Sequence, residues 1–272
     1  TAAAIASKLG LPLLVYQGLG GRHRYNSDRH HHFILESARG FAAELSMLGL
    51  KLHFHLPIEP TKRGPLSGLL ERAAFVVSEL FPVPPFTHWY AGHAERHPKL
   101  PWLLVDTACV LPMPLAEKLI TRAYVFRNKY MENIKSRALQ AWPESPDWPR
   151  SFEGDVGFEP FDLEESFSPA VAACQIDHSI PPVADTPGGT KAGYRRWQAF
   201  LANRLDHYHL RRNDAVLTEA VSRMSAYLHY GCVSPFRIAK DALERGGEGA
   251  DKFLRSEEHT SELQSPCNLV CR

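Results

Sequence analysis

The sequence lacks the features of a membrane protein and of a strongly charged one. No apolar run reaches the roughly 18 residues that span a bilayer, and the opening residues 1–5 lack the basic flank of a signal peptide. Lys and Arg total 31 against 30 Asp and Glu, so the formal net charge is +1. We expect a globular, cytoplasmic protein without a membrane partner, which would bind any nucleic acid through a local patch.

Cysteine is also scarce. Of the five cysteines, Cys267 and Cys271 lie in the last segment, residues 255–272, which resembles a translated sequencing-library adapter. We therefore leave this adapter-derived tail out of the reasoning about fold. The other three, Cys109, Cys174 and Cys232, share no metal-ligand spacing and favour reduced thiols.

The first part of the chain alternates between short apolar runs and helix-length segments. The runs cover residues 11–16, 50–56, 73–77 and 102–110. This rhythm predicts an α/β fold, with a parallel, Rossmann-like sheet over residues 1–112. We expect residues 11–16 and 102–105 to share one sheet.

Two helices frame the start of this domain. The longest is expected from an N-cap at Ser27 to Gly49. The chain opens in an amphipathic segment with Ala4, Ile5 and Leu9 on one face, without an earlier strand. We expect that a first strand is missing and that the sequence is truncated at both ends.

The composition and the expected secondary structure change after residue 112. Residues 113–187 are predicted to be an interdomain connector, helical near 123–134 and with little regular structure over 138–187, because prolines crowd residues 143–149. Residues 188–254 begin an all-α domain, with short helices expected at 225–230 and 234–246. Its first helix carries an apolar face of Tyr194, Trp197, Leu201, Leu205 and Tyr208.

Three groups of residues suggest chemistry but have simpler structural explanations. Residues 188–193 have the frame of a phosphate loop, yet Tyr194 and Arg195 replace its Lys and Ser or Thr, so a glycine turn is favoured. His30, His31 and His32 point about 100° apart on a helix and cannot close on one zinc ion. Capping or solvation is expected for the carboxylates Asp28, Glu36, Asp106 and Asp214.

A fourth group suits a phosphate. Ser222 and Ser225 stand three apart at an expected helix start, with Arg223 between them. Exposed amides, the helix dipole and the two hydroxyls together favour an anion. Alone, the pattern is also typical of an ordinary helix cap.

In combination, three segments resemble the DNA photolyase and cryptochrome family where its helical domain begins to wrap FAD. They are RLDHY at 204–208, VSRMS at 221–225 and AYLHYG at 226–231. Residues 27–36, 76–82 and 105–112 are similar to the α/β domain of the class II photolyase branch. Val221, Met224 and Ala226 depart from the usual residues, which affects the subgroup more than the cofactor.

The resemblance implies a light-driven lyase. A parent protein of this family transfers an electron from reduced FAD to a cyclobutane pyrimidine dimer in UV-damaged DNA, acting as a monomer. A cryptochrome-like photoreceptor without repair activity is the alternative. Neither the dimer type nor a second, antenna chromophore is indicated.

The same resemblance assigns roles to individual residues. Tyr208 would contact the FAD phosphate region, although a core tyrosine is an equally simple explanation. The pyrophosphate would be held by Ser222, Arg223, Met224 and Ser225. The catalytic residues are expected beyond Leu254, so we expect the chain as given to be inactive.

Overall fold

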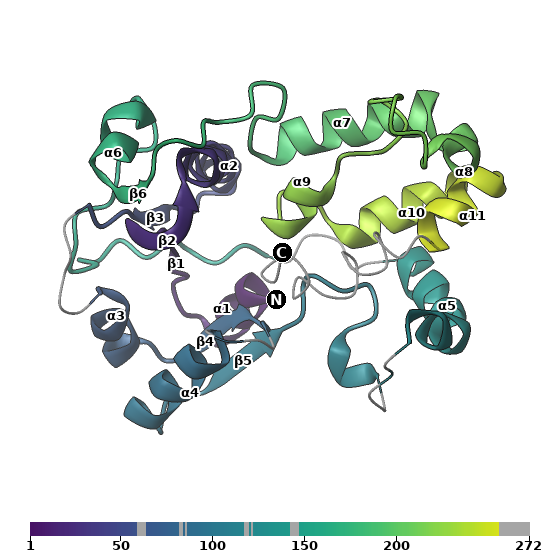
Figure 1. Ribbon diagram of the computed structural model, residues 1–272. Helices are drawn as coiled ribbons and strands as arrows, with labels where there is room; N and C mark the ends of the chain where they lie inside the picture. Colours follow the sequence, from purple (N-terminus) through teal and green to yellow (C-terminus); the bar gives the residue numbers. More distant parts are fainter. Residues whose placement is uncertain are drawn as a thin grey trace. The chain divides into compact units, whose positions relative to one another are not determined.

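The computed structural model describes residues 1–58, 64–81, 84, 86–116, 120, 122–141 and 147–255. The adapter-like residues from 256 onward lie outside this range. The chain divides into two compact units, coloured along the sequence in Figure 1. The first unit comprises Thr1–Ser78, His88–Leu103 and Pro143–Thr190, and the second comprises Glu79–Thr87, Leu104–Trp142 and the described part of Lys191–Arg272.

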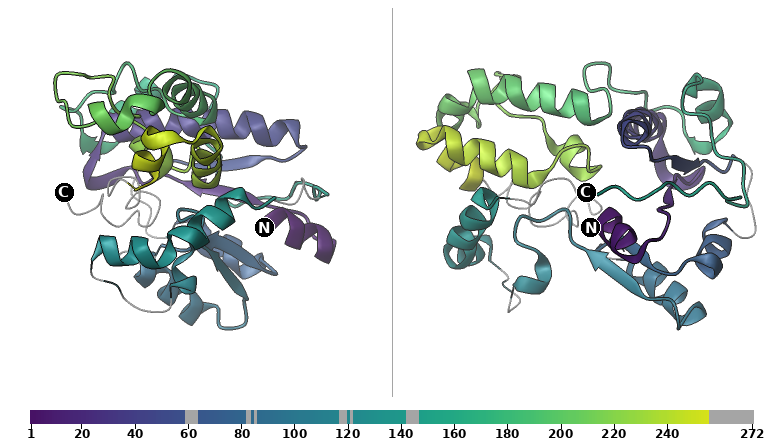
Figure 2. Two further views of the ribbon diagram at one scale, coloured as in Figure 1. Left: turned by 90° about the vertical axis from the view of Figure 1, so that its right-hand side faces the viewer. Right: turned by 180° about the vertical axis from the view of Figure 1, so that it is seen from behind.

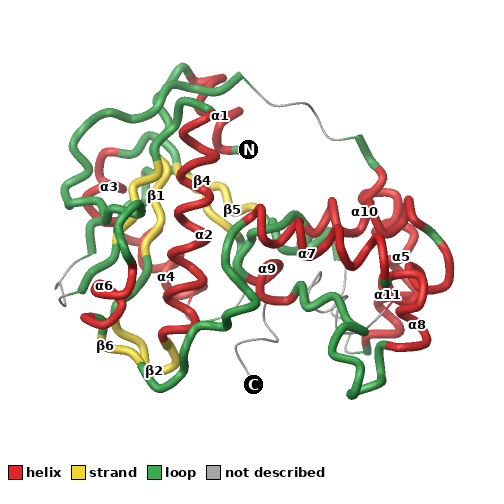
Figure 3. Tube along the Cα trace, turned by 90° about the horizontal axis from the view of Figure 1, so that it is seen from above, coloured by secondary structure: helices red, strands yellow, loops and turns green. Residues whose placement is uncertain are grey.

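The first unit is built around a pair of parallel strands, β1 (Val15–Gly18) and β3 (Leu52–His55). Val15 pairs with Leu52, and the register continues to Gly18 opposite His55. Helix α2 (Asp28–Met47) connects these strands and runs beside them in Figure 3, as expected for a parallel crossover. The parallel α/β fold class predicted from the sequence is confirmed.

Helix α2 forms where the sequence predicts it. Ser27 is its N-cap, and Gly49 after it has a φ of 71°, which glycine adopts at low cost. One face packs on the strand pair through residues spaced three and seven apart, which are Leu35, Ala38 and Leu45. These side chains and Phe54 are at most 6% exposed.

Two elements in this unit differ from the predictions. Helix α1 (Ala2–Leu9) buries Ala3 and Ala6, whereas Leu9 of the predicted apolar face is 54% exposed. Strand β2 (Arg22–Ser27) was not predicted, and it pairs in parallel with the equally unexpected β6 (Gln175–Asp177). The pairing is irregular, because the register shifts between Arg22 and Ser27.

The expectation of one shared sheet was wrong. β5 (Trp102–Val105) pairs with β4 (Val76–Glu79), while β1 pairs with β3, so the described strands form separate two-stranded sheets. Leu13, which precedes β1, forms an isolated parallel bridge with Ser151. An apolar run predicts that a strand forms, but its neighbour depends on which backbone groups meet in space.

The segment predicted to have little regular structure contributes to the core. It contains α6 (Phe167–Ala173) and β6, and Leu163, Phe167 and Val171 are buried against α2 and β3. Arg39 on α2 donates to the carbonyls of Leu163 and Glu165, at 2.5 and 2.6 Å. These contacts hold the segment on the α/β core, so the prediction was wrong for residues 167–177. The domain boundaries themselves stay a prediction.

The second unit contains an aromatic core among helices. Trp197 and Phe200 come from α7 (Thr190–Asn203), Tyr208 begins α8 (Tyr208–Arg211) and Phe253 lies on α11 (Gly247–Arg255). Their ring centroids lie 5.3 to 6.0 Å apart in the contacting pairs, and each side chain is at most 1% exposed. Figure 2 shows these helices side by side.

The helix predicted through Tyr208 is interrupted. α7 ends at Asn203, Arg204 has a φ of −134°, and a 3-10 turn over Leu205–His207 leads into α8. Leu205 and Tyr208 are nevertheless fully buried, as their spacing predicts. The remaining helices are α3 (Leu66–Arg72), α4 (Phe86–Arg96), a 3-10 turn at Met113–Leu115, α5 (Ala123–Leu139), α9 (Ser225–His229) and α10 (Pro235–Arg245).

Among the described residues, no helix combines the length and apolarity that crossing a bilayer requires. Cys109, Cys174 and Cys232 are buried and are not in disulfides.

Candidate functional site

The candidate anion site is the turn over residues 221–225, which precedes α9 in the second unit. The chain alternates in burial here: Ser222 is 3% exposed and Met224 is fully buried, whereas Arg223 between them is exposed. The two inward side chains attach the turn to the core. Arg223 lies on the exposed side of the turn.

The backbone of Arg223 is unusual. Its φ is 53°, and among the described residues it is the non-glycine residue with a positive φ. A non-glycine residue in this region costs roughly 1–3 kcal/mol, so the surrounding structure must enforce it. Such a cost is often found at sites that bind ligands.

The residue after Arg223 has a backbone conformation of the opposite hand. Met224 has φ −86° and ψ −8°, in the right-handed helical region. Successive residues with left-handed and right-handed backbone conformations turn their amide N–H groups toward one side. This arrangement is called a nest and binds anions. The amides of Arg223, Met224 and Ser225 occupy such a turn.

Ser222 adds a buried polar group beside these amides. Its Oγ has no hydrogen-bond partner among the described residues, although it is shielded from solvent. A buried hydroxyl without a partner costs about 1–3 kcal/mol, because it has given up its bonds to water. The half-buried Ser225 opens α9, where the first amides have no partner within the helix. This donor set fits a phosphate.

A glycine inside α7 brings that helix close to α9. A Cβ on Gly193 would lie 2.6 Å from Val233 Cγ1 and 2.9 Å from Tyr227 Cδ1. Only a residue without a side chain allows this approach, and Tyr227 is fully buried as a result. A glycine in the middle of a helical pattern is the sequence signal that could have shown this contact.

Tyr208 has a packing role in this structure. It is fully buried, with its ring 5.8 Å from Phe200 and 5.6 Å from Phe253. The Arg212 guanidinium lies 5.6 Å from the ring centroid. The interpretation as a core tyrosine therefore describes its observed contacts, and a role toward a cofactor stays a prediction.

The groups that the sequence analysis set aside have structural partners. Gly188 donates its amide to Glu36 Oε2 at 2.6 Å, and Asp106 accepts from the amides of Ala108, Cys109 and Met113 at 3.0 to 3.2 Å. Asp214 likewise accepts from the amide of Val216 at 3.0 Å. The described residues contain no cluster suited to a metal ion.

Two proteins of known sequence resemble the chain over most of its length. No protein-family model matches it. It is 26% identical over 235 residues to a deoxyribodipyrimidine photo-lyase of Potorous tridactylus, covering 86% of this chain and 42% of the relative. It is also 26% identical over 244 residues to the deoxyribodipyrimidine photo-lyase of Methanothermobacter thermautotrophicus, covering 89% and 51%. The chain thus spans about half the length of the curated relatives it matches.

Solved structures agree at the level of the fold. A cryptochrome of Synechocystis sp. PCC6803 matches with a TM-score of 0.69 at 16% identity, over 95% of this chain and 57% of its own. A class III photolyase of Agrobacterium tumefaciens gives 0.63 at 13%, over 97% and 52%. The photolyase of Sulfolobus tokodaii, described with two FAD molecules, gives 0.60 at 14%, over 94% and 54%.

Fold and site together define a class of proteins in which a parallel α/β unit is joined in one chain to a helical unit with an aromatic core. Both the sequence relatives and the structural neighbours belong to one such group. The chain is therefore similar in sequence and in fold to the photolyase/cryptochrome family.

Proposed function

We propose that the whole protein is a light-driven DNA repair enzyme that splits cyclobutane pyrimidine dimers, and that this chain holds the phosphates of its FAD. The observation that carries the proposal is the 221–225 turn, where Arg223 is held at a φ of 53° beside the buried, unpartnered Ser222 hydroxyl. This turn coincides with the family-like motif. Both sequence relatives are named deoxyribodipyrimidine photo-lyase.

The residues present fit a pyrophosphate. The amides of Arg223, Met224 and Ser225 would donate to phosphate oxygens, as in other anion nests. The hydroxyls of Ser222 and Ser225 would add two donors, and the exposed Arg223 guanidinium would offset the charge. Met224 itself contributes only backbone, because its side chain is fully buried.

When bound, reduced FAD supplies the photoexcited electron that opens the dimer and is afterwards returned. The protein's part is to hold the cofactor, orient it and exclude water. The residues of this chain would do this only for the phosphate end of FAD. Tyr208 would assist by fixing the core behind the site, with its ring locked between Phe200 and Phe253.

The proposed partner is UV-damaged DNA, bound by a monomer in the cytoplasm. A damaged base pair is poorly stacked, which lowers the cost of turning the dimer out of the duplex. With a formal net charge of +1, the protein must attract DNA through a local basic surface rather than through its overall field. No residue of this chain is assigned to the dimer pocket or to a second chromophore, and the class II assignment is carried by the sequence resemblance.

The experiment has two arms. The 272-residue chain is titrated with FAD and with riboflavin, which lacks the phosphates, and binding is followed by fluorescence anisotropy. A phosphate site predicts that FAD binds at least about tenfold more tightly than riboflavin, because each hydrogen bond to a charged phosphate contributes roughly 1.5–3 kcal/mol. Equal affinities would contradict the assignment.

The second arm uses the full-length parent protein. Under blue or near-ultraviolet light it should convert thymine dimers in an oligonucleotide to monomers, with no conversion in the dark. Bound flavin without any light-dependent repair would reject the lyase and favour the cryptochrome-like photoreceptor.

A further inference from the structure

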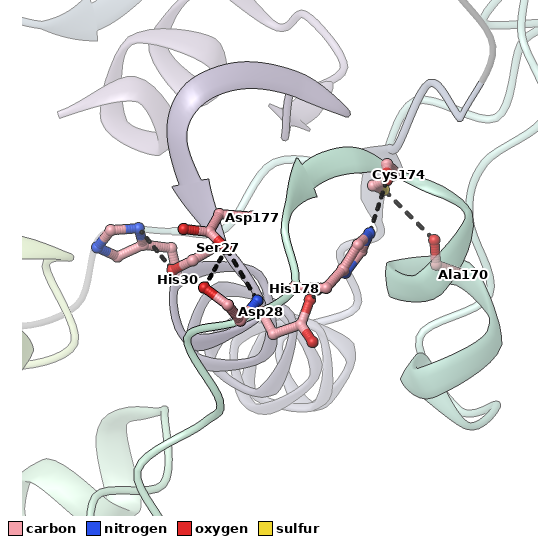
Figure 4. A network of polar contacts seen from close by, with 8 residues as sticks. Ser27, Asp28, His30, Ala170, Cys174, Asp177 and His178 are labelled. Atoms are coloured by element: carbon pink, nitrogen blue, oxygen red, sulfur yellow. Dashed lines mark hydrogen bonds and ion pairs between the residues drawn. The ribbon is translucent and has the colours of Figure 1, made fainter.

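A polar network in the first unit links β6 to the amino terminus of α2. Figure 4 shows its residues, with His178 reaching both α2 and the end of α6. His178 Nδ1 lies 2.7 Å from Asp28 Oδ1, and its Nε2 lies 3.1 Å from the carbonyl oxygen of Cys174. One imidazole therefore joins two segments 150 residues apart in sequence.

Both partners of the imidazole are acceptors. A peptide carbonyl has no proton to donate, and a carboxylate such as that of Asp28, in the first turn of α2, accepts hydrogen bonds. A neutral imidazole carries one N–H, which could serve only one of the two oxygens. The observed geometry satisfies both contacts only when His178 is doubly protonated.

We propose that His178 is a pH-sensitive latch, which holds residues 175–181 on the amino terminus of α2 while its ring is an imidazolium and releases them when the ring loses a proton. The latch would regulate how firmly the segment leading to α7 is anchored within its own unit. It acts independently of the proposed DNA repair.

The surrounding charges support protonation of the ring. The hydrogen bond to Asp28 is the main reason that the pKa of His178 is raised above its ordinary value, with burial acting in the opposite direction. Asp177, whose own pKa is lowered by the Ser179 hydroxyl, adds a further negative charge. The described titratable and charged groups near this corner are Asp28, Arg29, His30 and His31 on α2, the Cys174 thiol after α6, and Asp177 on β6.

Without the latch, the segment is held by its short strand, by the Gln175 amide, which donates to the carbonyl of Gly21 at 2.8 Å, and by Ile176, which packs on the core. β6 has three residues, and its pairing with β2 rests on two partner pairs on either side of a register shift. Two further bonds come from Arg29, whose amide and Nε donate to the carbonyls of Ile180 and Pro181 at 3.2 and 3.3 Å. A short irregular strand opens more easily than the core, so the loss of one charged hydrogen bond should be visible here.

The direction of the pH effect follows from the raised pKa. The folded segment binds the proton more tightly than the open one, so the latch is fully effective below the ordinary histidine pKa of about 6.5. Its contribution is lost as the pH rises through the higher, folded pKa. The segment should therefore loosen as the pH rises above the ordinary histidine pKa.

The test is hydrogen exchange of the full 272-residue chain between pH 6 and 9, corrected for the intrinsic exchange rate, together with NMR titration of the histidine rings. In the wild type, amide protection of residues 175–180 should fall roughly tenfold or more across this range, with a midpoint matching the His178 ring. His178→Gln should be poorly protected at every pH, and Asp28→Asn should lower the midpoint.

His88→Gln is the matched control, because His88 is exposed on α4. It should behave as the wild type does. The proposal is overturned if amide protection of residues 175–180 does not change with pH, if His178→Gln keeps the wild-type profile, or if the His178 ring titrates at or below the ordinary value.

Discussion

The indole Nε1 of Trp197 donates a 2.8 Å hydrogen bond to Oδ2 of Asp241, which joins α7 to α10. Trp197 is fully buried, and its ring lies 5.3 Å from that of Phe253. The bond lets a large aromatic side chain enter the core without leaving its N–H unpaired. A partly buried carboxylate gains a donor in return.

Trp197→Phe should therefore lower the free energy of unfolding by about 1–3 kcal/mol or more. The change leaves Asp241 without its donor and removes packing volume. Urea unfolding measures the change. Asp241→Asn is the control, because its amide oxygen can still accept from the indole, and its loss should be smaller. Equal stability of Trp197→Phe and wild type would show that the bond contributes nothing.

Replacing Ser222 and Ser225 together by Ala should weaken FAD binding, by roughly 1.5–3 kcal/mol for each hydrogen bond lost to a charged phosphate. Fluorescence titration of the chain, or flavin content of the purified parent protein, measures the effect. Ser136→Ala, at an exposed position on α5, should leave binding unchanged. Unaltered affinity in the double variant would refute the phosphate role.

Ser222→Ala alone separates binding from folding. The hydroxyl is buried without a partner among the described residues, so its removal should leave the stability of the flavin-free chain unchanged or increased. The same change should reduce FAD affinity. A destabilised flavin-free variant would indicate that Ser222 has a structural partner instead.

The φ of 53° at Arg223 predicts opposite effects for two substitutions. Arg223→Gly removes the backbone cost and should maintain or raise the melting temperature, although FAD affinity falls with the lost charge. Arg223→Val places a β-branched residue in the left-handed region and should destabilise the chain by more than about 1 kcal/mol. Thermal unfolding compares the two, and equal melting temperatures would mean that the residue is not held in this conformation.

Two glycines in helices should respond oppositely to Ala. A Cβ on Gly249 of α11 would collide with the carbonyl oxygen of Leu205, so Gly249→Ala should destabilise the second unit by about 1–3 kcal/mol. A Cβ on Gly40 of α2 meets nothing within 4 Å, so Gly40→Ala should stabilise by about 0.5–1 kcal/mol. Denaturant midpoints of both variants decide the matter, and a tolerated Gly249→Ala would contradict the close contact.

Burial, with the nearby Cys232 as a smaller cause, raises the pKa of Tyr230 to about 12. An unfolded tyrosine ionises near pH 10, so the folded state holds the phenol proton more tightly. The stability that this difference contributes is complete below pH 10 and is lost as the pH rises toward 12. In a difference-absorbance titration at 295 nm, Tyr230→Phe should remove one late phenolate step. Loss of an early step near pH 10 would place the group in solvent.

Local patterns allowed much of the chain to be predicted. The apolar spacing of α2 and the Ser234-Pro235 start of α10 depend on neighbours in sequence, and both helices occur where expected. The same holds for burial of Trp197, Leu205 and Tyr208, because helical periodicity selects the inward face even where the helix is interrupted at Arg204.

Other features depended on contacts between distant segments. The pairing of β2 with β6, the separate sheets of β1 and β5, and the core role of Phe167 follow from segments that meet only after folding. No short window of sequence contains both partners of such a contact.

The phosphate turn combines both kinds of information. The sequence determined by itself that two serines flank an arginine at a helix start, because this pattern is written in adjacent residues. Only the tertiary structure decided that Ser222 and Met224 turn inward while Arg223 is held at positive φ. The physical reason is that the backbone conformation of Arg223 depends on which neighbouring side chains the core buries. That core is assembled from helices far apart in the chain.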